Sequence, residues 1–303
     1  MTHVATLVTP QDQPVLDDAA IARAASLLPD ATNPKWLAPQ AAADIPFTPA
    51  GEIPIRELAE RIRTALAKTR VDIFIQPHAH RRKRLLLADM DSTMIRQECI
   101  DELADFVGLK QKVSAITERA MSGEIEFEPA LRERVALLRG LEHKIVDRIL
   151  DERIVLTPGG RALVQTMRAN GAHTVLVSGG FTVFAERIAG AIGFQEARAN
   201  VLVIDGEFFA GTVNEPILGR EAKVATLIEL RSALGLDRAD TLAIGDGAND
   251  LAMLKEAGLG VAYHAKPAVA AAAHARVDHC DLTALLYAQG YRREEFTESP
   301  SPG

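Results

Sequence analysis

The chain has 303 residues, of which 48% are hydrophobic and 25% are charged, and its formal net charge is −7. This composition is typical of a soluble globular protein, and the acidic balance argues against a dedicated nucleic-acid binder, since phosphate backbones attract basic surfaces. No segment reaches the roughly 18 apolar residues that a membrane span needs. The N-terminus has neither the basic start nor the apolar stretch of a signal peptide. Two cysteines, Cys99 and Cys280, are too few for a disulfide framework. We therefore expect a soluble, cytoplasmic protein with neither nucleic acid nor membrane as a partner.

Residues 1–80 carry the signals of a small N-terminal α/β domain. The strand signals are short runs of apolar residues, and the helix signals are apolar residues at three- and four-residue spacing. The stretch 29–54 is rich in Pro and Ala and poorly periodic, so it is predicted to be irregular. The predicted elements are a strand at 4–8, a helix capped by Asp17 or Asp18, a helix at 55–69 and a strand at 71–75.

The pattern changes near residue 81. The basic run 81–84 is interpreted as a solvated linker that leads into a strand. Short apolar strands at 85–88, 174–177 and 241–244 then alternate with amphipathic helices, and each strand ends in acidic or Gly-rich sequence. Nearly continuous apolar strands separated by helices predict an α/β fold with a doubly wound parallel sheet. Ligands of such sheets bind at the carboxyl ends of the strands, so we expect the site there.

Two segments depart from this alternation. Residues 98–155 contain helical patterns only and follow the first core strand directly, so they are predicted to form a helical cap over the site. The tail 291–303 is polar and ends in Ser-Pro-Ser-Pro-Gly, so it is predicted to be disordered. The main domain is thus expected to span residues 81–290.

The chemistry is concentrated first in Asp89-Met90-Asp91. Two acids separated by one residue, just past a buried strand, are placed to project from the sheet edge into one pocket. Asp89 could attack phosphorus as a nucleophile and divide one difficult displacement into two easier ones. Asp91 is then placed to protonate the leaving alcohol and later to activate water.

Three further elements fit the same chemistry. The sequence Ser178-Gly179-Gly180 at a strand end can cradle an anion with a hydroxyl and backbone amides. Lys223 in the first turn of a predicted helix would benefit from a bound anion there. In the sequence Gly245-Asp246-Gly247-Ala248-Asn249-Asp250, Asp246 joins Asp89 in offering the hard oxygen ligands that Mg²⁺ prefers.

Taken together and in order, these four elements resemble the haloacid dehalogenase superfamily of phosphatases, whose fold is a doubly wound sheet with a cap. The resemblance implies a Mg²⁺-dependent phosphomonoester hydrolase that works through a phosphorylated Asp89. It implies that the metal is held by Asp89, the backbone carbonyl of Asp91, and Asp246. Asp250 would support the metal or Lys223.

Within that superfamily, residues 89–98 and 121–135 resemble the corresponding segments of the phosphoserine phosphatase family, and the similarity extends over most of residues 85–280. The resemblance implies hydrolysis of O-phospho-L-serine, the last step of serine biosynthesis. A cap offering one acid and one arginine also complements a phosphorylated amino acid by charge. The residues implied to bind substrate are Glu98 at the ammonium, Arg134 at the carboxylate, Phe127 over the ligand, and Ser178, Gly179, Lys223 and Asn249 around the phosphate.

Longer members of that family carry an amino-acid-sensing (ACT-like) module of four strands at the N-terminus. Only two of those strands are evident in residues 1–80, so we interpret the domain as an incomplete module. A structural role for this domain, or the formation of a homodimer through it, is then an alternative to ligand sensing.

Other functions remain open at this point. One is a phosphatase or phosphotransferase for another small phosphomonoester. A second is a phospho-acceptor signalling domain, against which the acid Asp91 and the long helical insert argue. A third is a non-enzymatic amino-acid sensor, which the intact set of Asp89, Asp91, Lys223 and Asp246 disfavours.

Overall fold

A computed structural model describes residues 1–50, 53–121 and 124–297. Within these ranges the strands form three sheets, of four, six and two strands. The chain divides into two compact units, and the boundary between them passes through strands of the six-stranded sheet. The first unit comprises residues 1–87, 158–174 and 227–303, and the second comprises residues 88–157 and 175–226.

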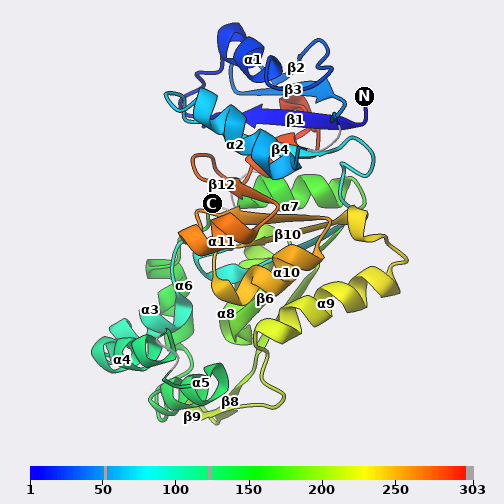
Figure 1. The fold of residues 1–303 in the computed structure, drawn as a ribbon. Coiled ribbons are helices and arrows are strands. Elements are labelled where there is room, and N and C mark those ends of the chain that lie inside the picture. The colour runs from blue at the N-terminus through cyan, green and yellow to red at the C-terminus, as the bar shows by residue number, and fades with distance from the viewer. Residues whose placement is uncertain (51–52, 122–123, 298–303) are drawn as a thin grey trace. The chain divides into compact units, whose positions relative to one another are not determined.

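The N-terminal domain is an antiparallel four-stranded sheet with two helices in the order βαββαβ (Figure 1). This is the element order of ferredoxin-like modules. The prediction of an irregular stretch at 29–54 is wrong, because two of the four strands lie within it, and the module is therefore not incomplete. The elements are β1 (His3–Val8), α1 (Asp18–Ala25), β2 (Lys35–Ala38), β3 (Ala42–Phe47), α2 (Ile55–Ala65) and β4 (Asp72–Pro77), with the strands in the order β2-β3-β1-β4.

One face of this sheet is apolar and packs against α1 and α2. Side chains alternate between the two faces of a strand, so every second residue of β1, β3 and β4 points to the helices. Asp17 begins α1 by accepting a hydrogen bond from the Ala20 N–H at 2.7 Å, as one of the two predicted caps. The core between sheet and helices contains Ala5, Leu7, Ile45, Phe47 and Ile73 from the strands and Ile21, Leu58 and Ile62 from the helices.

The opposite face of the sheet is partly polar and contacts the C-terminal part of the chain. Arg81 donates to both carboxylate oxygens of Asp44 at 2.6 Å, and also to the carbonyls of Tyr287 and Ala288 at 3.1 and 2.8 Å. The Arg81 side chain is only 10% exposed, and Lys83 is 7% exposed. The interpretation of 81–84 as a solvated linker is therefore wrong for these two residues, because Lys83 is buried and the Arg81 side chain is largely shielded from solvent.

The six-stranded sheet confirms the predicted parallel α/β core. Its strand order is β12-β11-β10-β5-β6-β7, and the β6–β7, β10–β11 and β11–β12 pairs are parallel. Every residue of β5 and β10 is buried, as expected for strands covered on both faces. The strands are β5 (Leu85–Ala88), β6 (His173–Phe181), β7 (Glu196–Asn200), β10 (Thr241–Gly245), β11 (Leu259–Tyr263) and β12 (Ala275–Val277).

The predicted helical insert after the first core strand is also confirmed. An antiparallel bridge between Ile95 and Leu156 lies where the chain leaves and re-enters the core. In Figure 1 the hairpin of β8 (Leu202–Asp205) and β9 (Phe208–Val213) lies beside α5. We call residues 98–155 the cap. Its helices are α3 (Cys99–Phe106), α4 (Lys110–Met121), α5 (Phe127–Ala136) and α6 (Ile145–Glu152).

The remaining helices lie between the core strands along the chain, except α12 (Ala284–Ala288), which follows the last of them. Within the described ranges, no helix combines the length and the apolarity needed to cross a bilayer. These helices are α7 (Gly160–Ala169), α8 (Thr182–Ile192), α9 (Arg220–Ala233), α10 (Leu251–Glu256), α11 (Pro267–Ala272) and α12 (Ala284–Ala288).

The polar tail begins later than predicted. Tyr291 is 1% exposed, and the Phe296 ring lies 4.9 Å from that of Tyr287, centroid to centroid. Residues 293–295 form a 3₁₀ turn. The expectation of disorder from residue 291 is therefore wrong for residues 291–297, while residues 298–303 lie outside the described part of the chain.

Candidate active site

Asp89 follows the buried strand β5 and begins an unusual turn. Its carboxylate accepts a hydrogen bond from the Met90 N–H at 2.8 Å. The next residues, Met90–Met94, form a wide turn in which Asp91 is extended and Ser92 has a φ of +54°. A residue other than glycine in the left-handed region costs free energy and is held there by its surroundings. The turn therefore places the two acids of the motif at the strand end.

Lys223 is the cation paired with Asp89. Its Nζ lies 2.6 Å from Asp89 Oδ1, and the two side chains are 1% and 7% exposed. Lys223 comes from the first turn of α9, while Asp89 comes from the end of β5, so the pair joins two of the sequence elements identified above. A buried lysine requires a paired charge, and here it neutralises the candidate nucleophile.

Asp91 faces the glycine-rich turn of β6. Its Oδ2 accepts a hydrogen bond from the Ser178 hydroxyl at 3.4 Å, and its Oδ1 accepts one from the Cys99 N–H at 2.9 Å. The same Ser178 oxygen accepts from the Gly180 N–H at 2.9 Å. A Cβ on Gly180 would lie 3.1 Å from Asp91 Oδ2, so a side chain at this position would crowd the acid.

Burial raises the pKa of Asp91, although the Cys99 hydrogen bonds, the Lys223 charge and the Ser178 hydrogen bond all act in the opposite direction. A carboxyl group with a raised pKa holds its proton more readily at neutral pH. Asp91 is therefore better suited to donate a proton than Asp89, which is paired with a lysine.

Asp246 and Asp250 lie in the turn after β10. Asp250 is fully buried and accepts a hydrogen bond from the Gly247 N–H at 3.1 Å. A Cβ on Gly245 would lie 2.4 Å from the Asp250 carboxylate, which explains the glycine there. Asn249, by contrast, is exposed on this turn.

The carboxylate oxygens of Asp89, Asp246 and Asp250 lie within 4.8 Å of one another. Three carboxylates so close together repel each other unless a cation offsets their charge. All of their donor atoms are hard oxygens, the type that hard divalent cations prefer. This group is therefore an acidic cluster suited to hold a metal ion.

The cap brings acids and an arginine together. Glu98 accepts a hydrogen bond from the Ser92 hydroxyl at 2.7 Å. Arg134 is partly buried in the last turn of α5, with its Nη1 3.5 Å from Thr117 Oγ1. Burial lowers the pKa of Arg134, and the charges of Asp101 and Glu98 raise it. Glu98 and Arg134 thus interact electrostatically.

Phe127, the first residue of α5, lies over two glycines of the core. A Cβ on Gly179 would lie 3.5 Å from the Phe127 ring, and one on Gly219 would lie 3.4 Å from it. The ring remains 40% exposed. Gly179 is part of the predicted phosphate turn, so this contact connects the cap to that turn.

Asn200, at the end of β7, escaped the sequence analysis. It is 3% exposed, and its side chain hydrogen-bonds to Gly179 and Leu218. The signal that could have found it is the rule that located Asp246, namely a polar residue at the carboxyl end of a core strand. β7 (Glu-Ala-Arg-Ala-Asn) lacks the apolar run of the other strands, so the sequence does not indicate a core strand there.

Comparison with known proteins agrees with this arrangement. The family model of the haloacid dehalogenase-like hydrolases matches residues 86–255. A phosphoserine phosphatase of Streptomyces coelicolor is 38% identical over 296 residues, which cover 96% of this chain and 72% of that protein.

Two solved structures are similar over much of their length. A HAD family hydrolase from Salmonella enterica serovar Typhi has a TM-score of 0.83 at 27% identity and covers 97% of this chain and 99% of its own. A phospho-aspartyl intermediate analogue of phosphoserine phosphatase has a TM-score of 0.62 at 36% identity, over 68% of this chain and 98% of its own.

Proposed function

The chain belongs to the haloacid dehalogenase-like hydrolase family, and from this premise we propose that it is a phosphoserine phosphatase that hydrolyses O-phospho-L-serine to L-serine and inorganic phosphate. The observation that carries the proposal is the buried pair of Asp89 and Lys223, with Nζ 2.6 Å from Oδ1. It provides a carboxylate nucleophile and a cation to receive the phosphate charge. The relative from Streptomyces coelicolor, which bears the name of this activity, supports the choice of substrate.

In the first half of the reaction, Asp89 Oδ attacks phosphorus and forms an aspartyl phosphate. The bond between phosphorus and the serine oxygen breaks, and that oxygen takes the proton of the Asp91 carboxyl group. Burial raises the pKa of Asp91, which favours this proton-donating role. Serine leaves with its hydroxyl restored, and Asp91 is left as a carboxylate.

In the second half, water attacks the phosphorus of the aspartyl phosphate. Asp91, now ionised, takes a proton from that water, and the bond between phosphorus and the Asp89 oxygen breaks. Inorganic phosphate leaves, while Asp89 returns as a carboxylate and Asp91 as an acid. One residue therefore serves first as acid and then as base, as the two halves require.

The turn after β6 and Lys223 are suited to hold the phosphoryl oxygens throughout. Ser178 brings a hydroxyl, and Gly179 and Gly180 offer backbone amides that approach an anion without steric hindrance from a side chain. Preorganised donors of this kind stabilise the charge that develops in the transition state. The Lys223 ammonium nitrogen lies at this place, 2.6 Å from Asp89 Oδ1.

The acidic cluster fits Mg²⁺ as the resident cation, held by Asp89, Asp246 and the backbone carbonyl of Asp91, with Asp250 in support. A bound Mg²⁺ would offset the negative charge of the phosphate and of the carboxylates around it.

The cap would distinguish phosphoserine from other phosphomonoesters. Arg134 offers a guanidinium for the substrate carboxylate, and Glu98 offers a carboxylate for its ammonium group. The interaction of Arg134 with Asp101 and Glu98 supports a preformed arrangement of charge in the cap. Phe127 would cover the ligand next to Gly179.

We also propose a cytoplasmic location, to which the two buried free cysteines, Cys99 and Cys280, are suited. A homodimer through the N-terminal domain remains a prediction. Since one face of its sheet packs on α1 and α2 and the other contacts the C-terminal segment, such a dimer would use the outer surfaces of the helices or the edge strand β2.

The proposal is tested by measuring phosphate release from a panel of phosphomonoesters in the presence of Mg²⁺. The panel should contain L-phosphoserine, phosphothreonine, glycerol phosphate and p-nitrophenyl phosphate. The highest kcat/KM is expected for L-phosphoserine. A higher value for an ester without amino and carboxylate groups would replace this function with that of a general small-molecule phosphatase.

A further inference from the structure

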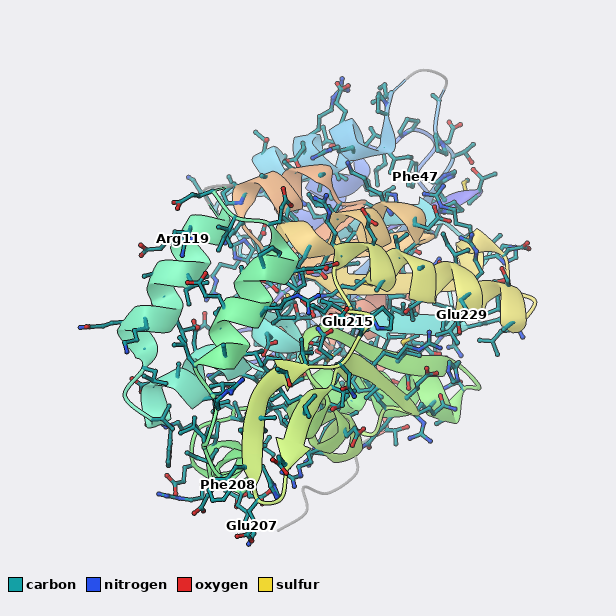
Figure 2. All side chains as sticks on the ribbon, turned by 90° about the horizontal axis from the view of Figure 1, so that it is seen from below. Phe47, Arg119, Glu207, Phe208, Glu215 and Glu229 are labelled. Atoms are coloured by element: carbon teal, nitrogen blue, oxygen red, sulfur yellow. The ribbon has the colours of Figure 1, made fainter. Side chains whose placement is uncertain are left out.

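The segment between β9 and α9, residues 214–219, lies between the cap and the phosphate turn. We call it the connecting segment. It ends at Arg220, where α9 begins, one turn before Lys223. In Figure 2, Glu215 of this segment is labelled at the opposite end of the β8–β9 hairpin from Glu207 and Phe208.

Asn200 fixes this segment to the phosphate turn. Its Oδ1 accepts a hydrogen bond from the Leu218 N–H at 2.6 Å, and its Nδ2 donates to the Leu218 carbonyl at 3.1 Å. The same Nδ2 donates to the Gly179 carbonyl at 2.9 Å. With 3% of the residue exposed, water cannot readily replace these bonds. A single amide thus joins the turn after β6 to the start of α9.

Phe127 of the cap rests on both of the parts that Asn200 joins. Its ring faces Gly179 on the phosphate turn and Gly219 on the connecting segment, at 3.5 and 3.4 Å from where their Cβ atoms would be. Two glycines side by side leave a flat surface on which an aromatic ring can pack. If the two parts moved apart, that surface would no longer match the ring.

A second contact ties the cap to the same segment. Arg132, on α5, forms an ion pair with Glu215. Both side chains are about half exposed, so this pair alone contributes little stability. It nevertheless shows that α5 meets the connecting segment at two places, through Phe127 at the start of the helix and through Arg132 further along.

We propose that Asn200 is a positioning residue that holds Gly179 and the connecting segment together as the seat on which Phe127 of the cap closes. Asn200 acts through Phe127 and does not itself contact the substrate. The proposal deepens the function assigned above and rests on it, because the seat matters for turnover only if the cap closes over phosphoserine.

The test is a double-mutant cycle between Asn200→Ala and Phe127→Ala, with kcat/KM for L-phosphoserine as the measured quantity. Each single variant should lose about tenfold. If Asn200 acts through Phe127, kcat/KM of the double variant should be at most about threefold lower than that of the less active single variant. The second substitution then removes an interaction that the first has already disrupted. A double variant whose loss equals the product of the two single losses, about a hundredfold, would overturn the proposal.

Gly219→Val provides a second route if Asn200→Ala fails to fold. It leaves Asn200 in place and puts a side chain where the Phe127 ring lies. It should lower kcat/KM and be non-additive with Phe127→Ala in the same way; additivity here would also count against the seat. Asn170→Ala is the matched control, because it removes an asparagine hydrogen bond at the end of α7, and it should change kcat/KM by less than twofold.

A measurement without substrate separates this proposal from the assigned function. Hydrogen exchange in the free protein should become faster in Asn200→Ala both in residues 214–222 and at the start of α5. Faster exchange in 214–222 alone would show that the cap does not depend on Asn200. Failure of wild-type protein to hydrolyse phosphoserine would instead refute the assigned function and leave this exchange result to decide on the seat.

Discussion

The ammonium nitrogen of Lys223 lies 2.6 Å from the Asp89 carboxylate, and the lysine is almost fully shielded from solvent. A charge pair in such a place is costly to break, because the charge that remains has lost its compensation in a poorly solvated environment. At the same time Lys223 is the cation closest to the atom that would receive the phosphoryl group. The two roles make this lysine sensitive to substitution in a measurable way.

Lys223→Met should therefore lower kcat by about 100- to 1000-fold, which corresponds to a loss of roughly 2.7–4 kcal/mol of transition-state stabilisation. Lys223→Arg keeps the positive charge but should recover only part of the rate. The planar guanidinium of arginine cannot replace the compact ammonium group in its contact with Asp89. Steady-state phosphate release from both variants measures the effect. A kcat within tenfold of wild type for Lys223→Met would remove the lysine from the reaction.

Asp89→Asn should leave a folded protein with no measurable turnover, because an amide cannot attack phosphorus. Asp91→Asn should slow turnover severely and yet still bind inorganic phosphate, since the nucleophile and Lys223 remain. Phosphate release and a phosphate-binding titration distinguish the two variants. Turnover of Asp89→Asn within tenfold of wild type would exclude Asp89 as the nucleophile.

Arg134→Ala should raise KM for L-phosphoserine by roughly 10- to 100-fold, because a charge-assisted hydrogen bond contributes about 1.5–3 kcal/mol. Hydrolysis of p-nitrophenyl phosphate, which has no carboxylate of this kind, should hardly change. Arg119→Ala is a suitable control, since Arg119 is a cap arginine that pairs with Glu124 and Glu133 on the surface. Equal losses for both substrates in Arg134→Ala would mean that this arginine is structural.

Removal of divalent cations should abolish activity, and Mg²⁺ should restore it, because a cation would offset the mutual repulsion of the Asp89, Asp246 and Asp250 carboxylates, which lie within 4.8 Å of one another. Excess Ca²⁺ should inhibit, as it accepts more ligands and a looser geometry than the octahedral arrangement of Mg²⁺. Activity is measured after chelation and then during titration with each ion. Full activity of chelator-treated protein would contradict a metal-dependent mechanism.

Lys83 should make the stability of the protein depend on pH in the alkaline range. Burial lowers the pKa of Lys83 to about 8 from 10.5, against the charge of Asp240, which raises it. Between these pH values the unfolded chain binds more protons than the folded protein, so the contribution of Lys83 to stability rises with pH. Relative to Lys83→Met, the wild-type free energy of unfolding should increase by roughly 2–3 kcal/mol from about pH 7.5 to 10.5. Denaturant unfolding of both proteins at several pH values measures this difference. If the free energies of unfolding of the wild type and Lys83→Met changed with pH in parallel, the prediction would be contradicted.

The core of the fold and several residues of the candidate site were accessible from the sequence because local signals and tertiary structure agree there. β5 and β10 are largely apolar runs followed directly by an acidic residue. Such apolar runs indicate buried strands. The order of Asp89, Ser178, Lys223 and Asp246 along the chain was enough to suggest a common site. The pairing of Lys223 with Asp89 and the contact of Asp91 with Ser178 bear out part of that suggestion.

The strands β2 and β3 could not be predicted in the same way. β3 contains three alanines or prolines in six residues, and β2 is only four residues long, so neither carries a strong preference for strand. They form because β1, a strand far away in sequence, pairs with β3 along its whole length. Non-local pairing of this kind has no counterpart in a local pattern, and the same holds for Asn200, whose partners are 18 and 21 residues away.

The polar face of the N-terminal sheet supplies hydrogen-bond partners to the C-terminal part of the chain. Besides Asp44, the partner of Arg81, this face includes Asp72, whose carboxylate accepts the backbone N–H groups of residues 278–280, and Gln76, which donates to the Ala288 carbonyl. A chain shortened to begin at Arg81 would keep Asp89, Asp91, Lys223 and Asp246 in full. It would nevertheless leave three amides and a guanidinium without their carboxylates, at about 1–3 kcal/mol for each buried group. A change in rate after removal of the N-terminal domain from this chain would therefore report on these C-terminal groups as well as on any regulation by that domain.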